Sequence, residues 1–144
     1  YPLLARYRDP LEFLEREPVA AEIAARRRAD LAQGLQQRPY WEGAAGAVYL
    51  LPDEPWSRRV IGSLANELAF AQPRRAHAVA RRAGDGHLAV SVRAPIEAPG
   101  GAAPLCRRFG GAGRAAAGGI DRLAESELER FVREFAAAPW GRNM

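Results

Sequence analysis

The sequence predicts an α/β (α+β) protein: a mixed β-sheet of about four to five strands with covering helices, preceded by an N-terminal helical connector. Three observations predict it. Apolar runs of strand length alternate with segments of helical periodicity. Asp85-Gly86 between two alternating runs indicates a β-hairpin. A content of 48% hydrophobic residues among 144 is enough for a packed core.

Residues 1–45 are predicted to form the helical connector. Asp9 suits an N-cap and Pro10 the first helical position, and Pro18 is expected to restart a second helix that runs to about Gln37. The predicted apolar stripe of this second helix comprises Val19, Ile23, Ala24, Leu31 and Leu35. Its opposite, solvated side is predicted to carry Arg26, Arg27, Arg28 and Asp30.

Residues 46–144 are predicted to form a second domain. A strand at 47–52 leads into a helix capped by Asp53, with an apolar stripe through its middle. After the hairpin come a proline- and glycine-rich loop and a short helix at about 103–109. A strand at 120–123 and a terminal helix follow, where Ser126 and Glu129 have the spacing of a capping box.

The hairpin strands are predicted at 75–82 and 87–95. An even-length loop through Ala83–Gly86 would place three small residues of the first strand on the same face as Ser91 and Arg93. The three small residues are Ala76, Ala78 and Ala80. A face with such small side chains and an arginine at its end would leave room for either a closely packed helix or a ligand.

Five glycines lie within residues 110–119, around Arg114. A flexible linker is one interpretation, but a helix before the segment and a strand after it favour a folded turn. The backbone N–H groups of successive glycines can bind an anion, because no side chain blocks its approach. The guanidinium of Arg114 would add further hydrogen-bond donors. A dinucleotide-binding loop needs a strand before and a helix after, which this order does not supply. A Walker loop is excluded because the chain has no lysine.

The sequence resembles the DHH-associated C-terminal domain of the DHH phosphoesterase superfamily in two places. These are Ser91-Val92-Arg93 and the segment from Phe109 to Gly119. That superfamily includes RecJ-type exonucleases, oligoribonucleases and cyclic-dinucleotide phosphodiesterases. Its signature is a strand with an S-x-R core, then a helix, a phenylalanine and a G-G-G-H-x-x-A-A-G loop before a strand. Asn66 matches a common helical asparagine of the family, more weakly. Arg114 replaces the family's histidine, which keeps an anion-binding group but removes one that titrates near neutrality.

The resemblance implies a phosphate-gripping site for a nucleotide or a short single-stranded nucleic acid. The residues it implies are Arg93, Gly110, Gly111, Gly113 and Arg114, with Ser91 and Asn66 in secondary positions. No catalytic residue and no metal ligand are expected in this chain, because it lacks an Asp-His-His segment and has only His77 and His87. Cys106 has no histidine placed to support it as a nucleophile and is expected to be a helix residue.

The superfamily's Mn or Mg ions would belong to a catalytic domain preceding Tyr1, so we expect this chain to be part of a longer hydrolase and inactive alone. A single cysteine and the lack of a long apolar run indicate a cytoplasmic protein with no membrane partner.

Two other classes stay open. The chain could be a protein-interaction or homodimerisation module in which the glycines form a close-packing joint. A general RNA binder is the other alternative, because all 21 basic residues are arginine and the net charge is +4. That alternative predicts arginines spread over one surface, whereas acids alternate with them along the predicted helices.

Overall fold

The computed structural model describes the backbone of residues 10–141 and side chains from residue 20. A mixed six-stranded sheet in the order β1-β2-β3-β4-β6-β5 forms its centre. The strands are β1 (Trp41–Glu42), β2 (Gly46–Leu51), β3 (Ala76–Arg82), β4 (His87–Arg93), β5 (Ala112–Gly113) and β6 (Ala117–Ala124). The predicted α+β class is confirmed, and the strand number is higher than predicted because β1 and β5, of two residues each, were not foreseen.

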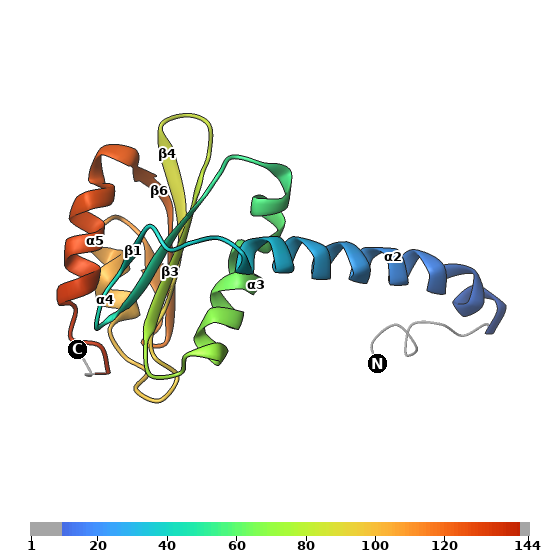
Figure 1. Ribbon diagram of the computed structural model, residues 1–144, viewed down its shortest axis with the longest axis horizontal. Helices are drawn as coiled ribbons and strands as arrows, with labels where there is room; N and C mark the ends of the chain where they lie inside the picture. Colours follow the sequence, from blue (N-terminus) through green and yellow to red (C-terminus); the bar gives the residue numbers. More distant parts are fainter. Residues whose placement is uncertain (1–9, 142–144) are drawn as a thin grey trace.

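Helices cover both faces of the sheet (Figure 1). On one face, α3 (Pro55–Ala71) packs its buried stripe against strand residues such as Leu51 and Val79. On the other, α4 (Ala102–Arg107) and α5 (Leu128–Ala137) enclose the larger core, which includes Phe131 and Phe135. The sheet separates the two cores. The face of the sheet on which a strand side chain lies therefore decides which helices it contacts.

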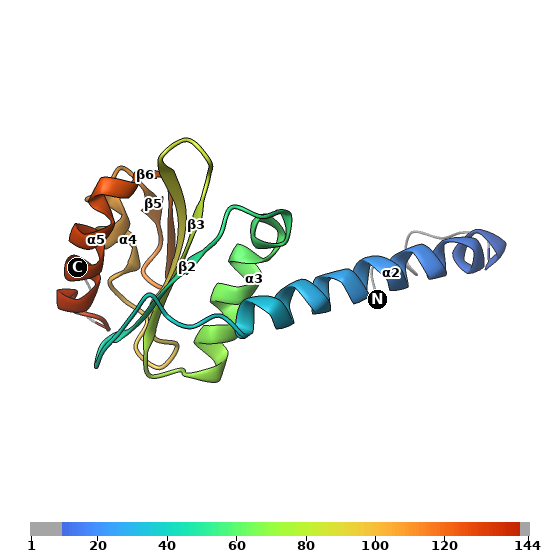
Figure 2. The same cartoon turned by 45° about the horizontal axis from the view of Figure 1, so that its top comes forward.

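The N-terminal region is one helix, α2 (Pro10–Leu35), and not the two that were predicted. Pro18 lies inside this helix, although an interior proline removes one N–H from the helical ladder. The helix extends away from the sheet, and its last turns lie against α3 (Figures 1 and 2). The predicted apolar stripe is covered only in part: Leu31 packs against the core on the α3 side, whereas Ile23 is 49% and Leu35 48% exposed. The predicted cap at Asp9 lies outside the described residues.

The hairpin between β3 and β4 is confirmed, but its loop length was predicted wrongly. Ala83 N–H donates to His87 O at 2.9 Å, which leaves the three-residue loop 84–86, with Gly84 and Gly86 at φ of +83° and +82°. An odd loop reverses the expected relation between the strand faces. Hence Val79, and not an alanine, lies opposite Ser91 in the register.

The three alanines of β3 consequently face the larger core, and not the face of Ser91 and Arg93. They pack there with the buried residues of α4 and α5. The residues are Ala76, Ala78 and Ala80. The face that carries Arg93 instead holds His77, Val79 and Arg81 and lies under α3.

Two helix starts also differ from expectation. The N-cap of α3 is Glu54 and not Asp53, and Ser57 Oγ accepts a hydrogen bond from the Glu54 N–H at 3.3 Å. A 3₁₀ turn over 125–127 precedes α5, whose N-cap is Glu127 without a side-chain cap, so the predicted capping box of Ser126 and Glu129 does not form. No helix among the described residues is long and apolar enough to cross a membrane.

Candidate phosphate-binding cleft

The glycine-rich segment is a β-hairpin, not a loop followed by a short strand. β5 pairs antiparallel with β6, and Arg114 N–H donates to Ala117 O at 2.7 Å, so the turn consists of residues 115–116. The turn is held at both of its carbonyls: Ala102 N–H donates to Ala115 O at 3.2 Å, and Ala94 N–H donates to Ala116 O at 2.9 Å. The strand predicted at 120–123 therefore begins at Ala117.

The glycines allow this hairpin to pack closely against α4. A Cβ on Gly111 would collide with the backbone oxygen of Gly119, and one on Gly118 would lie 2.8 Å from Cys106 Sγ. A Cβ on Gly113 would collide with the Gly118 backbone across the hairpin. Only glycine fits at these positions, because the obstructing atoms belong to backbone or to a buried side chain. All of these close contacts are made within the chain.

The backbone N–H groups of the predicted anion cradle are only partly free. Gly110 N–H donates to Arg107 O at 3.2 Å and Gly111 N–H to Cys106 O at 2.8 Å, so both close the end of α4. Gly113 differs. Because Arg114 and Ala117 form a hydrogen-bonded pair, the alternation of an antiparallel ladder directs the Gly113 N–H away from β6. Gly113 is exposed, so this donor faces the outside of the hairpin.

Arg93 is the last residue of β4 and lies half-buried beneath α3. Its Nε donates to Asn66 Oδ1 at 2.8 Å, and Nη1 donates to Val92 O at 3.0 Å. Ser91 lies two residues earlier on the same face, opposite Val79 and Gly119 in the register. The structure therefore brings together Arg93 and Asn66, which lie 27 positions apart in the sequence.

Arg93 and Arg114 lie on the same face of the sheet, two strands apart, because each is opposite Ala117 in the register. Burial and the neighbouring Arg114 lower the pKa of the Arg93 guanidinium. Among the side chains of residues 20–141, neither arginine forms an ion pair with a carboxylate. Two cations close together without an acid between them create a positive potential that an anion would relieve. Arginine forks suit phosphate oxygens for this purpose.

A cleft of about 260 Å³ opens beside Arg93. α3 supplies Asn66 and Phe70, the segment after β4 supplies Pro95 and Ile96, and the hairpin turn supplies its backbone-rich floor. The floor residues are Ala116 and Ala117. Three separate segments thus converge on one arginine, in an opening that is largely apolar apart from Arg93 and Asn66.

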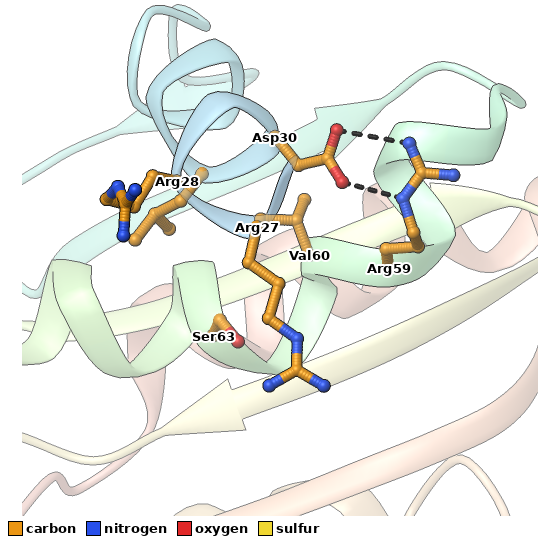
Figure 3. Close-up of a pocket in the computed structure, with 7 residues that line it drawn as sticks. Arg27, Arg28, Asp30, Arg59, Val60 and Ser63 are labelled. Carbon is orange, nitrogen blue, oxygen red and sulfur yellow. Dashed lines mark hydrogen bonds and ion pairs between the residues drawn. The ribbon is translucent and has the colours of Figure 1, made fainter. Parts of the chain in front are cut away.

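A larger cavity of about 370 Å³ lies between α2 and α3, away from this cleft. Figure 3 shows Arg59 of α3 paired with Asp30 of α2, while the side chain of Arg27 extends from α2 over α3, on the side of Ser63. The Arg59 Nε donates to Asp30 Oδ2 at 2.6 Å and Nη2 to Oδ1 at 3.1 Å. Asp30, predicted on a solvated face, is in fact 7% exposed and paired. Because its carboxylate already neutralises Arg59, we interpret this contact as the attachment of α2 to the domain.

The other reactive side chains serve the fold. Cys106 is fully buried in α4, and burial raises the pKa of its thiol to about 11, which argues against a nucleophile. His77 is 1% exposed on the α3 face, and burial, aided by Arg75, lowers its pKa to about 4. At the hairpin loop, the backbone N–H of His87 donates to Asp85 Oδ1, and His87 Nδ1 lies 3.3 Å from the backbone oxygen of Asp85. Within residues 20–141 no three His, Cys, Asp or Glu side chains gather as metal ligands would. These residues therefore do not fit the metal ions of a phosphoesterase centre.

Comparison with known proteins gives a fold likeness and no sequence relative. No family model matches the chain, and no curated protein matches it. Among solved structures, the chain is similar to the pGpG-specific phosphodiesterase PggH from Vibrio cholerae, with a TM-score of 0.54 and 13% sequence identity. The alignment covers 92% of this chain and 44% of that structure. The chain therefore shares the fold of part of that phosphodiesterase and spans less than half of its length.

Proposed function

We propose that this chain is a DHH-associated domain that grips the phosphate of a nucleotide or short single-stranded nucleic acid for a phosphodiesterase. The hydrogen-bonded pair of Arg93 and Asn66 at the cleft, with Arg114 two strands away on the same face, carries the proposal. The fold likeness to a phosphodiesterase supports it, as does the match of these residues to the S-x-R and glycine elements of the DHH-associated domain.

In this proposal Arg93 and Arg114 supply the charge, while the Gly113 N–H faces the outer edge of β5, away from Arg93, and would be a neutral donor only for a ligand that extends past Arg114. Gly110 and Gly111 contribute by shape, because their N–H groups are used at the end of α4. Ser91 stays in a secondary position on the same face. A guanidinium stays protonated at neutral pH, so these residues would hold the substrate without moving a proton.

Hydrolysis would take place on a metal centre outside residues 20–141, because these do not provide a ligand set. Mn or Mg held by another domain would supply a Lewis acid and an activated water there. The present chain would orient the phosphodiester toward that centre. Incubating the purified chain with Mn²⁺ and a dinucleotide should leave the substrate intact, and metal-dependent turnover at enzymatic rates would overturn the division of labour.

The phosphate grip is tested by titrating the chain into a fluorescein-labelled deoxyadenosine trinucleotide and following fluorescence anisotropy. Arg93→Ala and Arg114→Ala should each weaken binding by about 1–3 kcal/mol, the scale of a hydrogen bond to a charged group. Arg133→Ala is the matched control, because Arg133 is exposed on α5, beyond the opposite face of the sheet. An equal loss of affinity in all three variants would show that binding depends only on the net charge of the chain. That result would contradict a specific site at Arg93 and Arg114.

The salt dependence of this binding separates the proposal from an interaction module. Phosphate contacts displace counterions, so the logarithm of affinity should fall linearly with the logarithm of salt concentration. Removing Arg114 should make that slope shallower. A flat dependence in the unsubstituted chain would favour the interaction or dimerisation alternative instead.

A further inference from the structure

The cleft beside Arg93 has an apolar wall that a phosphate grip leaves unused. Phe70 is 72% exposed, which makes it the most exposed large hydrophobic side chain among residues 20–141, and Ile96 is 43% exposed. Both line the cleft that contains Arg93. An exposed phenylalanine ring lacks the stabilisation that burial gives to most phenylalanines. We therefore regard this ring as a candidate contact for a ligand.

The backbone places this wall next to the proposed phosphate grip. Phe70 follows Asn66 by four residues on α3, so the two side chains lie on the same side of the helix, one turn apart. Asn66 is the residue that holds the Arg93 guanidinium. Ile96, three residues after Arg93 and beyond the end of β4, lines the same cleft. The cleft therefore combines a fixed cation with an aromatic face and an aliphatic one.

A ligand that satisfies both features needs an anion and a flat apolar body a few bonds apart. Inorganic phosphate has only the first and an aliphatic partner only the second. A nucleotide has both, because every base offers a π-face and is joined to its phosphate through the sugar. The size of the opening points the same way: at about 260 Å³ it suits one small ring system. A stable protein interface, in contrast, buries about 1,200–2,000 Å².

We propose that Phe70 is a stacking platform for the nucleobase of the nucleotide whose phosphate Arg93 holds, with Ile96 bounding the opposite side of the base. This inference rests on the proposed function, because it takes the phosphate at Arg93 as its anchor. It narrows the ligand class to phosphates that carry a base. Stacking involves no hydrogen bond to the base edge, so the platform accepts different bases.

Two probes separate the platform from the phosphate grip. One is the labelled deoxyadenosine trinucleotide, and the other is a trimer of abasic deoxyribose units with the same phosphates and label. Phe70→Ala in the full 144-residue chain should weaken binding of the base-bearing probe by about 5- to 150-fold, as alanine substitution at stacked bases does. Binding of the abasic probe should change by less than about 2-fold, since only the stacking contribution is removed. Because Phe70 is largely exposed, the substitution should leave folding intact, and Phe70→Trp should restore or strengthen binding.

Each other outcome decides against one proposal. An equal loss for both probes, or no loss for either, would overturn the platform. A change in sedimentation with Phe70→Ala but no change in binding would identify the ring as a protein contact and overturn it too. Arg93→Ala should weaken both probes. Suppose that Arg93→Ala weakens binding of neither probe, while Phe70→Ala still weakens binding of the base-bearing probe alone. The proposed phosphate contact of Arg93 would then be wrong, and the stacking of a base on Phe70 would still stand.

Discussion

Arg93 Nε donates a 2.8 Å hydrogen bond to Asn66 Oδ1, which ties the end of β4 to the middle of α3. The bond holds the guanidinium in one orientation before any ligand arrives. A long side chain that is already ordered loses less rotamer entropy on binding. Asn66 is therefore a positioning residue in the proposed site, acting through Arg93.

Asn66→Ala should weaken trinucleotide binding by roughly 1 kcal/mol, the worth of one net hydrogen bond. In an Arg93→Ala background the same substitution should have almost no effect, because its partner is gone. A double-mutant cycle by fluorescence anisotropy measures this coupling. Ser63→Ala, at an exposed position earlier on α3, serves as the control. Additive losses would show that Asn66 acts independently of Arg93.

Gly111→Ala should destabilise the fold, because the added Cβ meets the Gly119 carbonyl oxygen and neither backbone can move without parting β5 from β6. We expect a loss of about 1–3 kcal/mol in the free energy of unfolding, typical of overpacking. Urea denaturation followed by tryptophan fluorescence measures it.

Gly62→Ala is the matched control for Gly111→Ala. It adds the same methyl group inside α3, where no atom lies within 4 Å of the new Cβ. Alanine is favoured over glycine in a helix, so this variant should gain roughly 0.5–1 kcal/mol. Similar losses in both variants would contradict the packing role assigned to Gly111.

Removing the Asp30 carboxylate should loosen α2 from α3. Asp30 is buried and accepts two hydrogen bonds from Arg59, and the pKa of this aspartate is lowered chiefly by that contact. In Asp30→Ala, trypsin should cleave faster after Arg26–Arg28, as mass spectrometry of timed digests would reveal. Glu22→Ala, at an exposed position on the same helix, should keep the original cleavage rate. An unchanged rate in Asp30→Ala would contradict the attachment role.

The buried His77 should make stability depend on pH. Burial lowers its pKa from 6.5 to about 4, and Nδ1 has no hydrogen-bond partner. As pH falls below 6.5 the unfolded chain takes up a proton that the folded chain refuses until about pH 4. The free energy of unfolding should therefore fall across this window, by up to roughly 3 kcal/mol at 1.36 kcal/mol per pKa unit.

His77→Leu should flatten the pH dependence of stability between pH 4.5 and 6.5. The leucine fills a comparable space and has no group to protonate, and no hydrogen bond is lost with Nδ1. Urea midpoints at pH 4.5 and 7.5 for both proteins provide the comparison. If the unsubstituted chain is equally stable at the two values, the histidine does not control acid stability.

Much of the fold was predictable because its signals are local. The Asp85-Gly86 hairpin and the stripe of α3 follow from patterns within a few residues, and both appear in the structure. The hairpin's register was not predictable in the same way. One residue more or less in the loop exchanges the two faces, and the sequence permits either a three- or a four-residue loop there. In the structure Ala83 pairs with His87, which leaves a three-residue loop in which the glycines at 84 and 86 both have positive φ.

The site shows a similar division. The sequence pattern itself drew attention to Arg93 and Arg114, and the family resemblance added Asn66 and the phosphate-binding role. The arrangement of the three depends on separate segments meeting, which no local pattern encodes. β5 was missed because glycine and alanine carry almost no strand preference, and its pairing depends on the close approach that bare backbone allows. The exposure of Phe70 could not be foreseen either, since an apolar residue near a helix end is normally assigned to the core.

The two-residue strands β1 and β5 have a consequence for self-association, since they are the outermost strands of the sheet. Longer unpaired edges are templates for adding strands from another molecule, and very short ones deny that template. These two short strands therefore offer a second copy little backbone to pair with, and growth into fibres by strand addition at β1 or β5 should be disfavoured.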